Sequence, residues 1–525
     1  MAGLDASYVD AFDKSRALGR ILHDLETDFV YAPHYHLLYA MLPDDLWALA
    51  IEKLKSGQYQ PSSLITAEIP KPSGLTRPGS ILTPIDRIIY QAVADLIADN
   101  LDSDLDGARV FSYRLIRPDD SNIMFRPRPE TYEEYREAMA TAASKSSFAL
   151  RTDIASYFFH VNHHTLENLL TSAGVPDGVI RLLVKTMLEA WSGRFSHGLP
   201  QGMFPSDLLG NYYLSTFDTY AASRGIPSVR YVDDIVMFFN EEFAARSSLA
   251  PLTRFLRTIG LDPNEAKTSI VTSEKAVHEE TELDRLFETA REEVLIEIEE
   301  GIAAFGYGFQ SPWEDDPETT EAAESQALNR LWEARPIEKG EKRDQLDRFC
   351  LTAYGRLGSD AIISDVLAEL GHRPHMTRTY CAYLSKFARG RDDVRGALQE
   401  MLKSKTAYDS ELQWPIAALL SASSNPPSSV SDALNILTDL RRSEELRALC
   451  AIFVGKFGNA ASRTVLRGHW DSEPAQHVKA AMIYSLLFFG KEERHVLLTY
   501  WGQQGEIFAL LAKAVRKAVS EKSPA

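Results

Sequence analysis

Three aspartates in two strand-like segments carry the clearest chemical signal in the sequence. Asp233 and Asp234 lie in RYVDDIVMFF, where apolar residues on both sides predict a β-hairpin with the acidic pair at its turn. Asp153 follows a second apolar run, in FALRTDIASYFF. A charge within a buried apolar run is costly unless it is paired or binds a metal ion. The two segments therefore predict a shared carboxylate site for Mg²⁺ or Mn²⁺, formed by Asp153, Asp233 and Asp234.

Such a site would catalyse phosphoryl transfer. One ion activates the attacking hydroxyl and the other stabilises the leaving pyrophosphate. Aspartates that only cap turns at strand ends are the alternative. That alternative suits Asp153 taken alone, but it suits a YVDD tetrapeptide between two apolar strands poorly.

Five more residues have the chemistry to contact a nucleotide. Lys71 and Arg77 flank a Gly/Pro-rich hairpin, which suits a flap that grips a triphosphate; a solvated basic turn is the alternative. Gln201 and Gly202 lie in LPQG, where a proline-restricted turn and a glycine allow the backbone to approach a base pair closely. Lys267 could place a cation near the pyrophosphate, or it could be a surface lysine.

The elements that must position these residues divide the chain in two. Residues 1–275 mix strands, expected at 64–70, 148–154 and 229–239, with helices at 34–56, 85–101, 163–173, 177–192 and 205–224. Residues 276–525 show almost only helical patterns separated by short Gly, Pro or Asn breaks. We therefore expect an α+β domain followed by an all-α domain. A HEAT-like helical repeat is the preferred form of the second domain, and a compact bundle is the alternative.

Composition excludes several classes of protein. The three cysteines are far apart and have neither disulfide-framework nor zinc-site spacing. No apolar stretch is long enough to span a bilayer, so we expect a cytoplasmic protein without membrane contact. The net charge of −18 argues against strong non-specific binding to duplex nucleic acid.

Five segments in order resemble the fingers and palm of reverse transcriptases, over about residues 30–270 (about half of the chain). They are IPKPSGLTRPGSILTPIDRIIYQAV at 69–93, DIASYFF at 153–159, GLPQGMFPSDLLGNYYLSTFD at 198–218, RYVDDIVMF at 230–238 and GLDPNEAKT at 260–268. The resemblance implies a DNA nucleotidyltransferase that uses deoxynucleoside triphosphates. It also implies that Phe158 lies against the sugar and excludes a 2′-hydroxyl, whereas a core aromatic is the alternative.

The segment after Lys267 departs from copying reverse transcriptases, since it has neither a recognisable primer grip nor a thumb motif. A palm followed by a large helical domain is similar to bacterial abortive-infection, or defence-associated, reverse transcriptases. That resemblance implies anti-phage defence, homo-oligomers and, in some members, template-independent synthesis primed on a protein hydroxyl. Tyr8 and Tyr31 are candidates for that hydroxyl by position alone. Two alternatives stay open: a retron or group II intron-like enzyme that copies a bound RNA template, and an inactive scaffold.

Overall fold

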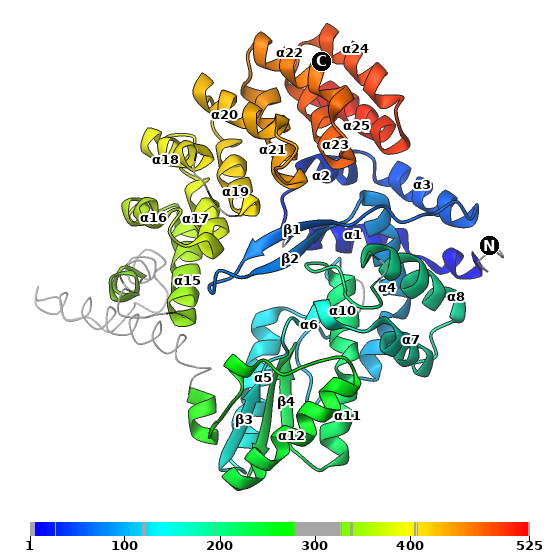
Figure 1. Ribbon diagram of the computed structural model, residues 1–525, viewed down its shortest axis with the longest axis vertical. Coiled ribbons are helices and arrows are strands. Elements are labelled where there is room, and N and C mark those ends of the chain that lie inside the picture. The colour runs from blue at the N-terminus through cyan, green and yellow to red at the C-terminus, as the bar shows by residue number, and fades with distance from the viewer. Residues whose placement is uncertain are drawn as a thin grey trace, which may run out of the picture. The chain divides into compact units, whose positions relative to one another are not determined.

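The computed structural model describes residues 6–26, 28–117, 122–193, 195–278, 326, 328–335, 340–403, 406 and 408–522. The chain forms two compact units (Figure 1). Unit 1 comprises Met1–Ala67, Arg77–Val277 and Leu466–Ala525, and unit 2 comprises Glu68–Thr76 and His278–Val465.

Unit 1 is built around a four-stranded antiparallel sheet with the order β4-β5-β3-β6. The strands are β3 (Phe148–Thr152), β4 (Ser228–Tyr231), β5 (Asp234–Phe239) and β6 (Ser269–Thr272). Helix α5 (Arg128–Ala143) covers one face, where its aromatic and methionine side chains pack on small and β-branched residues of β3, β4 and β5. Helix α12 (Glu242–Thr258) also contacts β3, β5 and β6. The predicted strand at 148–154 and the predicted hairpin at 229–239 are confirmed.

The helices of unit 1 follow the expected pattern, with two breaks and several additions. The helix expected at 34–56 is two helices, α2 (Pro33–Met41) and α3 (Pro43–Lys55), because Pro43 starts a new helix and cannot donate to the previous one. The helix expected at 205–224 divides at Leu214 into α10 (Phe204–Tyr213) and α11 (Ser215–Ser223). Helices α4 (Pro84–Ser103) and α7 (His163–Ser172) agree with prediction. Helices α1 (Lys14–Asp24), α5 and α12 were not predicted.

The last helices of the chain belong to unit 1. Helices α23 (Gln476–Ser485) and α25 (Glu506–Lys522) pack on α2, and α24 (Lys491–Gly502) packs on α25. Polar contacts reinforce this packing: His34 Nε2 lies 3.3 Å from His477 Nδ1, and Lys513 Nζ lies 2.7 Å from Asp45 Oδ1. The compact units therefore divide the chain differently from the expected boundary at residues 275 and 276. The reason is that the apolar faces of these terminal helices are buried against the N-terminal ones.

Unit 2 stacks its helices in two rows (Figure 1). Successive members of one row contact each other: α15 (Glu341–Leu357), α17 (Thr377–Leu384), α19 (Asp409–Leu419) and α21 (Glu444–Phe457). The second row is α16 (Ile363–Glu369), α18 (Asp392–Lys403) and α20 (Pro427–Thr438). The three cysteines, Cys350, Cys381 and Cys450, are buried in these helices as free thiols. Within the described residues of the whole chain, no helix combines the length and apolarity that a membrane span requires.

Strands β1 (Ile65–Pro70) and β2 (Thr76–Ile81) form the predicted Gly/Pro-rich hairpin. A unit boundary falls within each strand, so that the base of the hairpin belongs to unit 1 and its tip, Glu68–Thr76, belongs to unit 2. The tip is a tight turn in which Lys71 N donates to Leu75 O at 2.7 Å and Gly74 N donates to Lys71 O at 3.0 Å.

Candidate active site

The turn between β4 and β5 presents two of the three aspartates. Tyr231 pairs with Asp234 across the hairpin, which leaves Val232 and Asp233 at the turn. Val232 adopts the left-handed conformation (φ 59°), which is rare for a β-branched residue. Its backbone N–H donates to Ser112 Oγ at 2.7 Å, which helps to hold this strained turn. Strain of this kind persists where the surrounding structure enforces it, and such places are often functional sites.

Arg230 holds the hairpin from below. Its side chain is fully buried and forms a bidentate ion pair with Asp218 of α11, through Nε to Oδ1 at 3.0 Å and Nη2 to Oδ2 at 2.9 Å. The same guanidinium donates to Asn211 Oδ1 at 2.6 Å and to Val232 O at 3.2 Å. The structure supports a bracing role for Arg230 rather than a phosphate contact, because its donors are used internally.

The register of the sheet brings Asp153 to the same hairpin. Thr152, at the end of β3, lies opposite Ile235 of β5. Asp153 follows Thr152 directly after β3, and Asp234 precedes Ile235 on β5, so antiparallel pairing places them side by side. The main chain of Asp153 is also fixed, because Asn264 N donates to its carbonyl oxygen at 2.7 Å. All three predicted aspartates therefore meet at one end of the sheet.

The electrostatics of Asp233 reflect this clustering. Burial, together with the negative charges of Asp153 and Asp234 and a hydrogen bond with Asp153, raises the pKa of Asp233 to about 8. Like charges at close range cannot all ionise without a compensating cation, so one proton is retained. Among the described residues, no set of three His, Cys, Asp or Glu side chains stands in metal-ligand geometry. The chemistry of the donors nevertheless fits a hard divalent cation, since three clustered carboxylates supply the oxygen ligands and charge that Mg²⁺ prefers.

Two residues of the 260–268 segment contact Asp153 directly. Asn264 Nδ2 donates to Asp153 Oδ2 at 3.0 Å. Lys267 Nζ lies 3.4 Å from the same oxygen, and its side chain remains half exposed. Lys267 thus lies at the carboxylate cluster, as expected for a cation near a reacting phosphate. Asn264 was not singled out in the sequence, although its place in the GLDPNEAKT segment was the available signal.

Phe158 lies against α10, the helix that follows the LPQG segment. Ser156, with φ 47°, turns the chain sharply after Asp153. Tyr157 is buried, and its hydroxyl donates to Gly210 O on α10. A methyl group on Gly210 would lie only 3.0 Å from Phe158 Cε1, so the absence of a side chain there makes room for the partly buried ring. Of the neighbouring aromatics, Tyr157 is a core residue, whereas Phe159 is exposed.

Gln201 and Gly202 dock against the base of the β1–β2 hairpin. Ser80 N donates to Gln201 O at 3.2 Å, and Gln201 N donates to Ser80 Oγ at 3.1 Å. Gly202 has φ 90°, and a Cβ atom there would lie 2.6 Å from the ring of Phe29. Arg77 also lies over Phe29, with its guanidinium carbon 5.3 Å from the ring centre. Gly202 is therefore required by both conformation and space.

Three candidates remain. Lys71 is in the hairpin tip and belongs to unit 2. Tyr8 and Tyr31 are half-buried in unit 1. The Tyr8 ring packs near Phe12 at 6.0 Å, and the Tyr31 ring lies 5.9 Å from His36, where burial raises the pKa of the Tyr31 hydroxyl.

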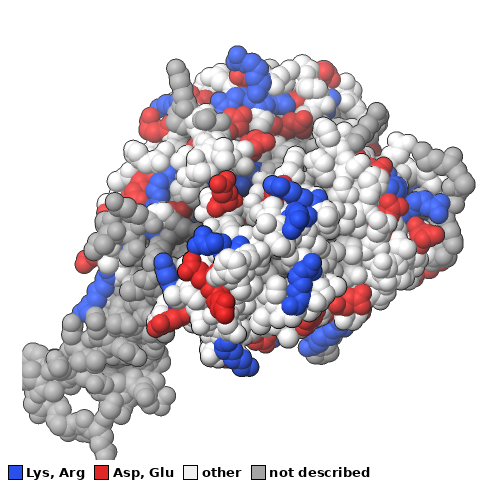
Figure 2. All heavy atoms as spheres, turned by 60° about the horizontal axis from the view of Figure 1, so that its bottom comes forward, with Lys and Arg blue, Asp and Glu red and all other residues white. Residues whose placement is uncertain are grey.

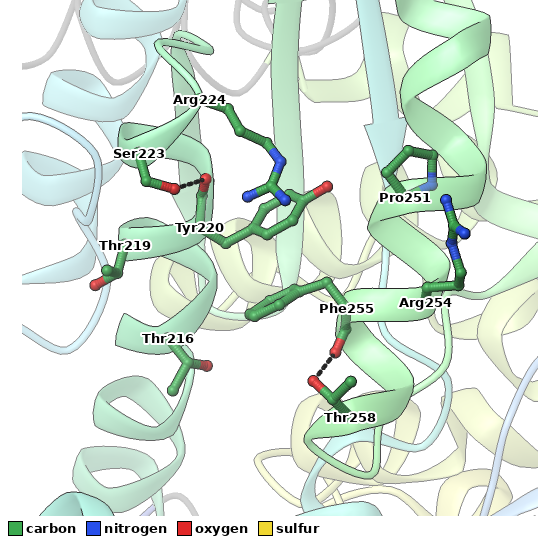
Figure 3. A pocket seen from close by; sticks show the side chains of 9 residues that line it. All are labelled: Thr216, Thr219, Tyr220, Ser223, Arg224, Pro251, Arg254, Phe255 and Thr258. Atoms are coloured by element: carbon green, nitrogen blue, oxygen red, sulfur yellow. Dashed lines mark hydrogen bonds between the residues drawn. The ribbon is translucent and has the colours of Figure 1, made fainter.

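A groove of about 500 Å³ lies between α11 and α12 (Figure 3). Tyr220 and Phe255 stack at 4.3 Å along it, and Arg224 lies over the other face of Tyr220 at 3.9 Å. None of the aspartates or candidate nucleotide contacts lines it.

Figure 2 shows a face of the protein where basic and acidic side chains occur in small separate groups among uncharged ones. Among the described residues of that face, Lys and Arg form no broad basic surface for non-specific binding.

Comparison with known proteins agrees with this geometry. Residues 69–294 match the family described as "Reverse transcriptase (RNA-dependent DNA polymerase)". Protein YkfC of Escherichia coli (strain K12) is 29% identical over 197 residues, which are 36% of this chain and 48% of that protein. The chain thus spans about half the length of this relative. The solved structure of apo telomerase from Candida tropicalis matches 89% of this chain and 73% of its own, with 11% identity and a TM-score of 0.31. The matched segment contains all three aspartates, so residues 69–294 are similar to reverse transcriptases over the part of the chain that holds the candidate site.

Proposed function

We propose that this protein is a DNA polymerase of the reverse transcriptase type that transfers deoxynucleotides from their triphosphates to a primer hydroxyl. The observation that carries the proposal is the convergence of Asp153, Asp233 and Asp234 at one end of the sheet, with an Asp233 pKa of about 8. A cluster of carboxylates destabilises the fold, and such clusters are typical of functional sites. This one suits a site that binds divalent cations, which in turn bind the triphosphate.

Each residue of the site has a separate task in this proposal. Asp153, Asp233 and Asp234 would hold Mg²⁺ or Mn²⁺, which when bound supplies hydroxyl activation and charge stabilisation. Asn264 orients the Asp153 carboxylate through its 3.0 Å hydrogen bond. Lys267, Lys71 and Arg77 would bind phosphate oxygens. Phe158 would lie against the sugar, and the backbone at Gln201 and Gly202 would lie along the base pair.

The test is primer extension on RNA and DNA templates by the full chain. We expect Asp233→Asn to reduce incorporation by about 1,000-fold, because metal-held charge contributes several kcal/mol to the transition state. The matched control is Asp262→Asn. Asp262 lies in the neighbouring 260–268 segment, but its side chain is exposed and pairs with Arg257 at 2.7 Å. Equal incorporation by wild type and Asp233→Asn would remove the catalytic assignment, and no incorporation by either would favour the inactive-scaffold alternative.

We further propose a defence role with homo-oligomers, and synthesis without a template primed on Tyr8 or Tyr31. The two-row helical stack of unit 2 supports this subtype, since a HEAT-like domain in place of a thumb is its expected architecture. Plating efficiency of phage on cells that express wild type or Asp233→Asn tests the defence role. A covalent protein–DNA adduct in mass spectra, lost in Tyr8→Phe or Tyr31→Phe, tests priming. Incorporation that requires an added RNA would instead favour the retron or group II intron-like alternative.

A further inference from the structure

The tip of the β1–β2 hairpin is bound by the start of helix α19, far away in the sequence. Tyr408 Oη donates to Gly74 O at 2.6 Å, across 334 residues of chain. Ser410 Oγ donates to Glu68 O. The two hydrogen bonds hold the tip at two points, since Glu68 lies on β1 and Gly74 lies in the turn. Lys71 lies between these two anchored points.

The anchor is itself rigid. Ser410 is buried, so its hydroxyl has little access to water as a competing partner. Thr406 Oγ1 accepts from Tyr408 N at 3.1 Å and donates to the buried Glu411 at 2.5 Å. Glu411 also accepts from Thr377 of α17 at 3.1 Å. Tyr408 is therefore connected to the stacked helices through two partly buried hydrogen bonds and one buried hydrogen bond.

The tip also has internal reasons to need an anchor. Gly74 adopts φ 80°, and Leu75 is exposed, so the turn has few apolar contacts of its own. A two-stranded hairpin without a packed face is marginally stable in water. The hydrogen bonds from α19 thus replace the packing that the tip lacks.

We propose that Tyr408 and Ser410 are positioning residues that hold the Lys71-bearing turn, so that the helical unit sets how the nucleoside triphosphate is gripped. The inference rests on the proposed function, because Lys71 acts on the triphosphate only if the protein is a polymerase. It gives the helical stack a part in nucleotide binding, in addition to any role in contacts with other molecules.

The first experiment is steady-state primer extension by Tyr408→Phe, Ser410→Ala and the double variant. Each single change should raise KM for deoxynucleotide about fivefold, the factor expected from one lost hydrogen bond, and leave kcat within about twofold. The matched controls are Tyr383→Phe, which removes a bond from the same type of hydroxyl to Ser359 O at 2.8 Å, and Ser421→Ala. In a Lys71→Ala background, Tyr408→Phe should have no further effect.

The second experiment needs no catalysis. Hydrogen–deuterium exchange in residues 68–76 should become about fivefold faster in the double variant, while exchange in α19 stays as in wild type. Unchanged exchange and unchanged KM in an active polymerase would overturn the positioning role alone. Faster exchange in a protein that incorporates no nucleotide would overturn the proposed function, and the positioning role would fall with it.

Discussion

Replacing Arg230 by methionine should destabilise unit 1 more than any other single change of a charged residue at the hairpin. The change keeps an apolar stem of similar length but removes the guanidinium that pairs with Asp218. The Asp218 carboxylate, with a side chain only 5% exposed, would then be buried without its cation. Asn211 Oδ1 and Val232 O would each lose a donor as well.

The magnitude follows from the burial of both partners. Breaking a buried ion pair by removing one partner costs about 3–5 kcal/mol, since the other charge stays desolvated. At about 2 °C per kcal/mol for a large domain, the unfolding midpoint should fall by about 6–10 °C. The left-handed turn at Val232 should also lose its support, so incorporation should fall even at temperatures where the variant is folded.

The assay is thermal unfolding followed by circular dichroism, with primer extension measured well below the transition. Arg224→Met is the matched control, because Arg224 is exposed and lies over the ring of Tyr220 at 3.9 Å. Its midpoint should change by less than about 2 °C. In an Asp218→Asn background, Arg230→Met should cost much less than in wild type, because the charges are coupled. A midpoint for Arg230→Met within about 2 °C of wild type would refute the reasoning.

Two further changes test other parts of the fold through unfolding midpoints. Burial raises the pKa of Glu445 from 4.5 to about 7. The stability that the protonated carboxyl contributes is therefore fully present below about pH 4.5 and is lost as the pH rises through 7. The free energy of unfolding of Glu445→Gln should therefore match that of wild type at pH 4.5 and exceed it by up to about 3 kcal/mol at pH 8. A difference in this free energy that does not change with pH would contradict the prediction. Gly202→Ala should cost about 3 kcal/mol, since its Cβ would lie 2.6 Å from Phe29. Gly57→Ala, with φ 68° and open space, should cost only about 1 kcal/mol; equal losses would exclude a steric cause.

Much of the site could be predicted because its signals are local. Apolar runs interrupted by aspartate predicted β3 and the β4–β5 hairpin, and the Gly/Pro pattern predicted the β1–β2 turn. Proline within the 34–56 pattern was the missed local signal, since Pro43 ends one helix and starts another. Helix α12 escaped prediction although its apolar residues have helical spacing, and it has Pro251 inside it. The packing of α12 on the sheet compensates for the hydrogen bond that this proline cannot make.

The sequence by itself determined which residues could do chemistry, since residue type and local periodicity are properties of short segments. The sequence alone identified Asp153, Asp233 and Asp234 as candidate metal ligands. Tertiary structure alone decided that β3 pairs with β5 in the register that brings Asp153 beside Asp234. It also decided that Arg230 pairs with Asp218, and that α19 binds Gly74 across 334 residues. The physical reason is that the pattern of apolar and polar residues predicts which face of an element is buried. It does not specify which other element that face packs against, because this depends on the packing of the whole chain.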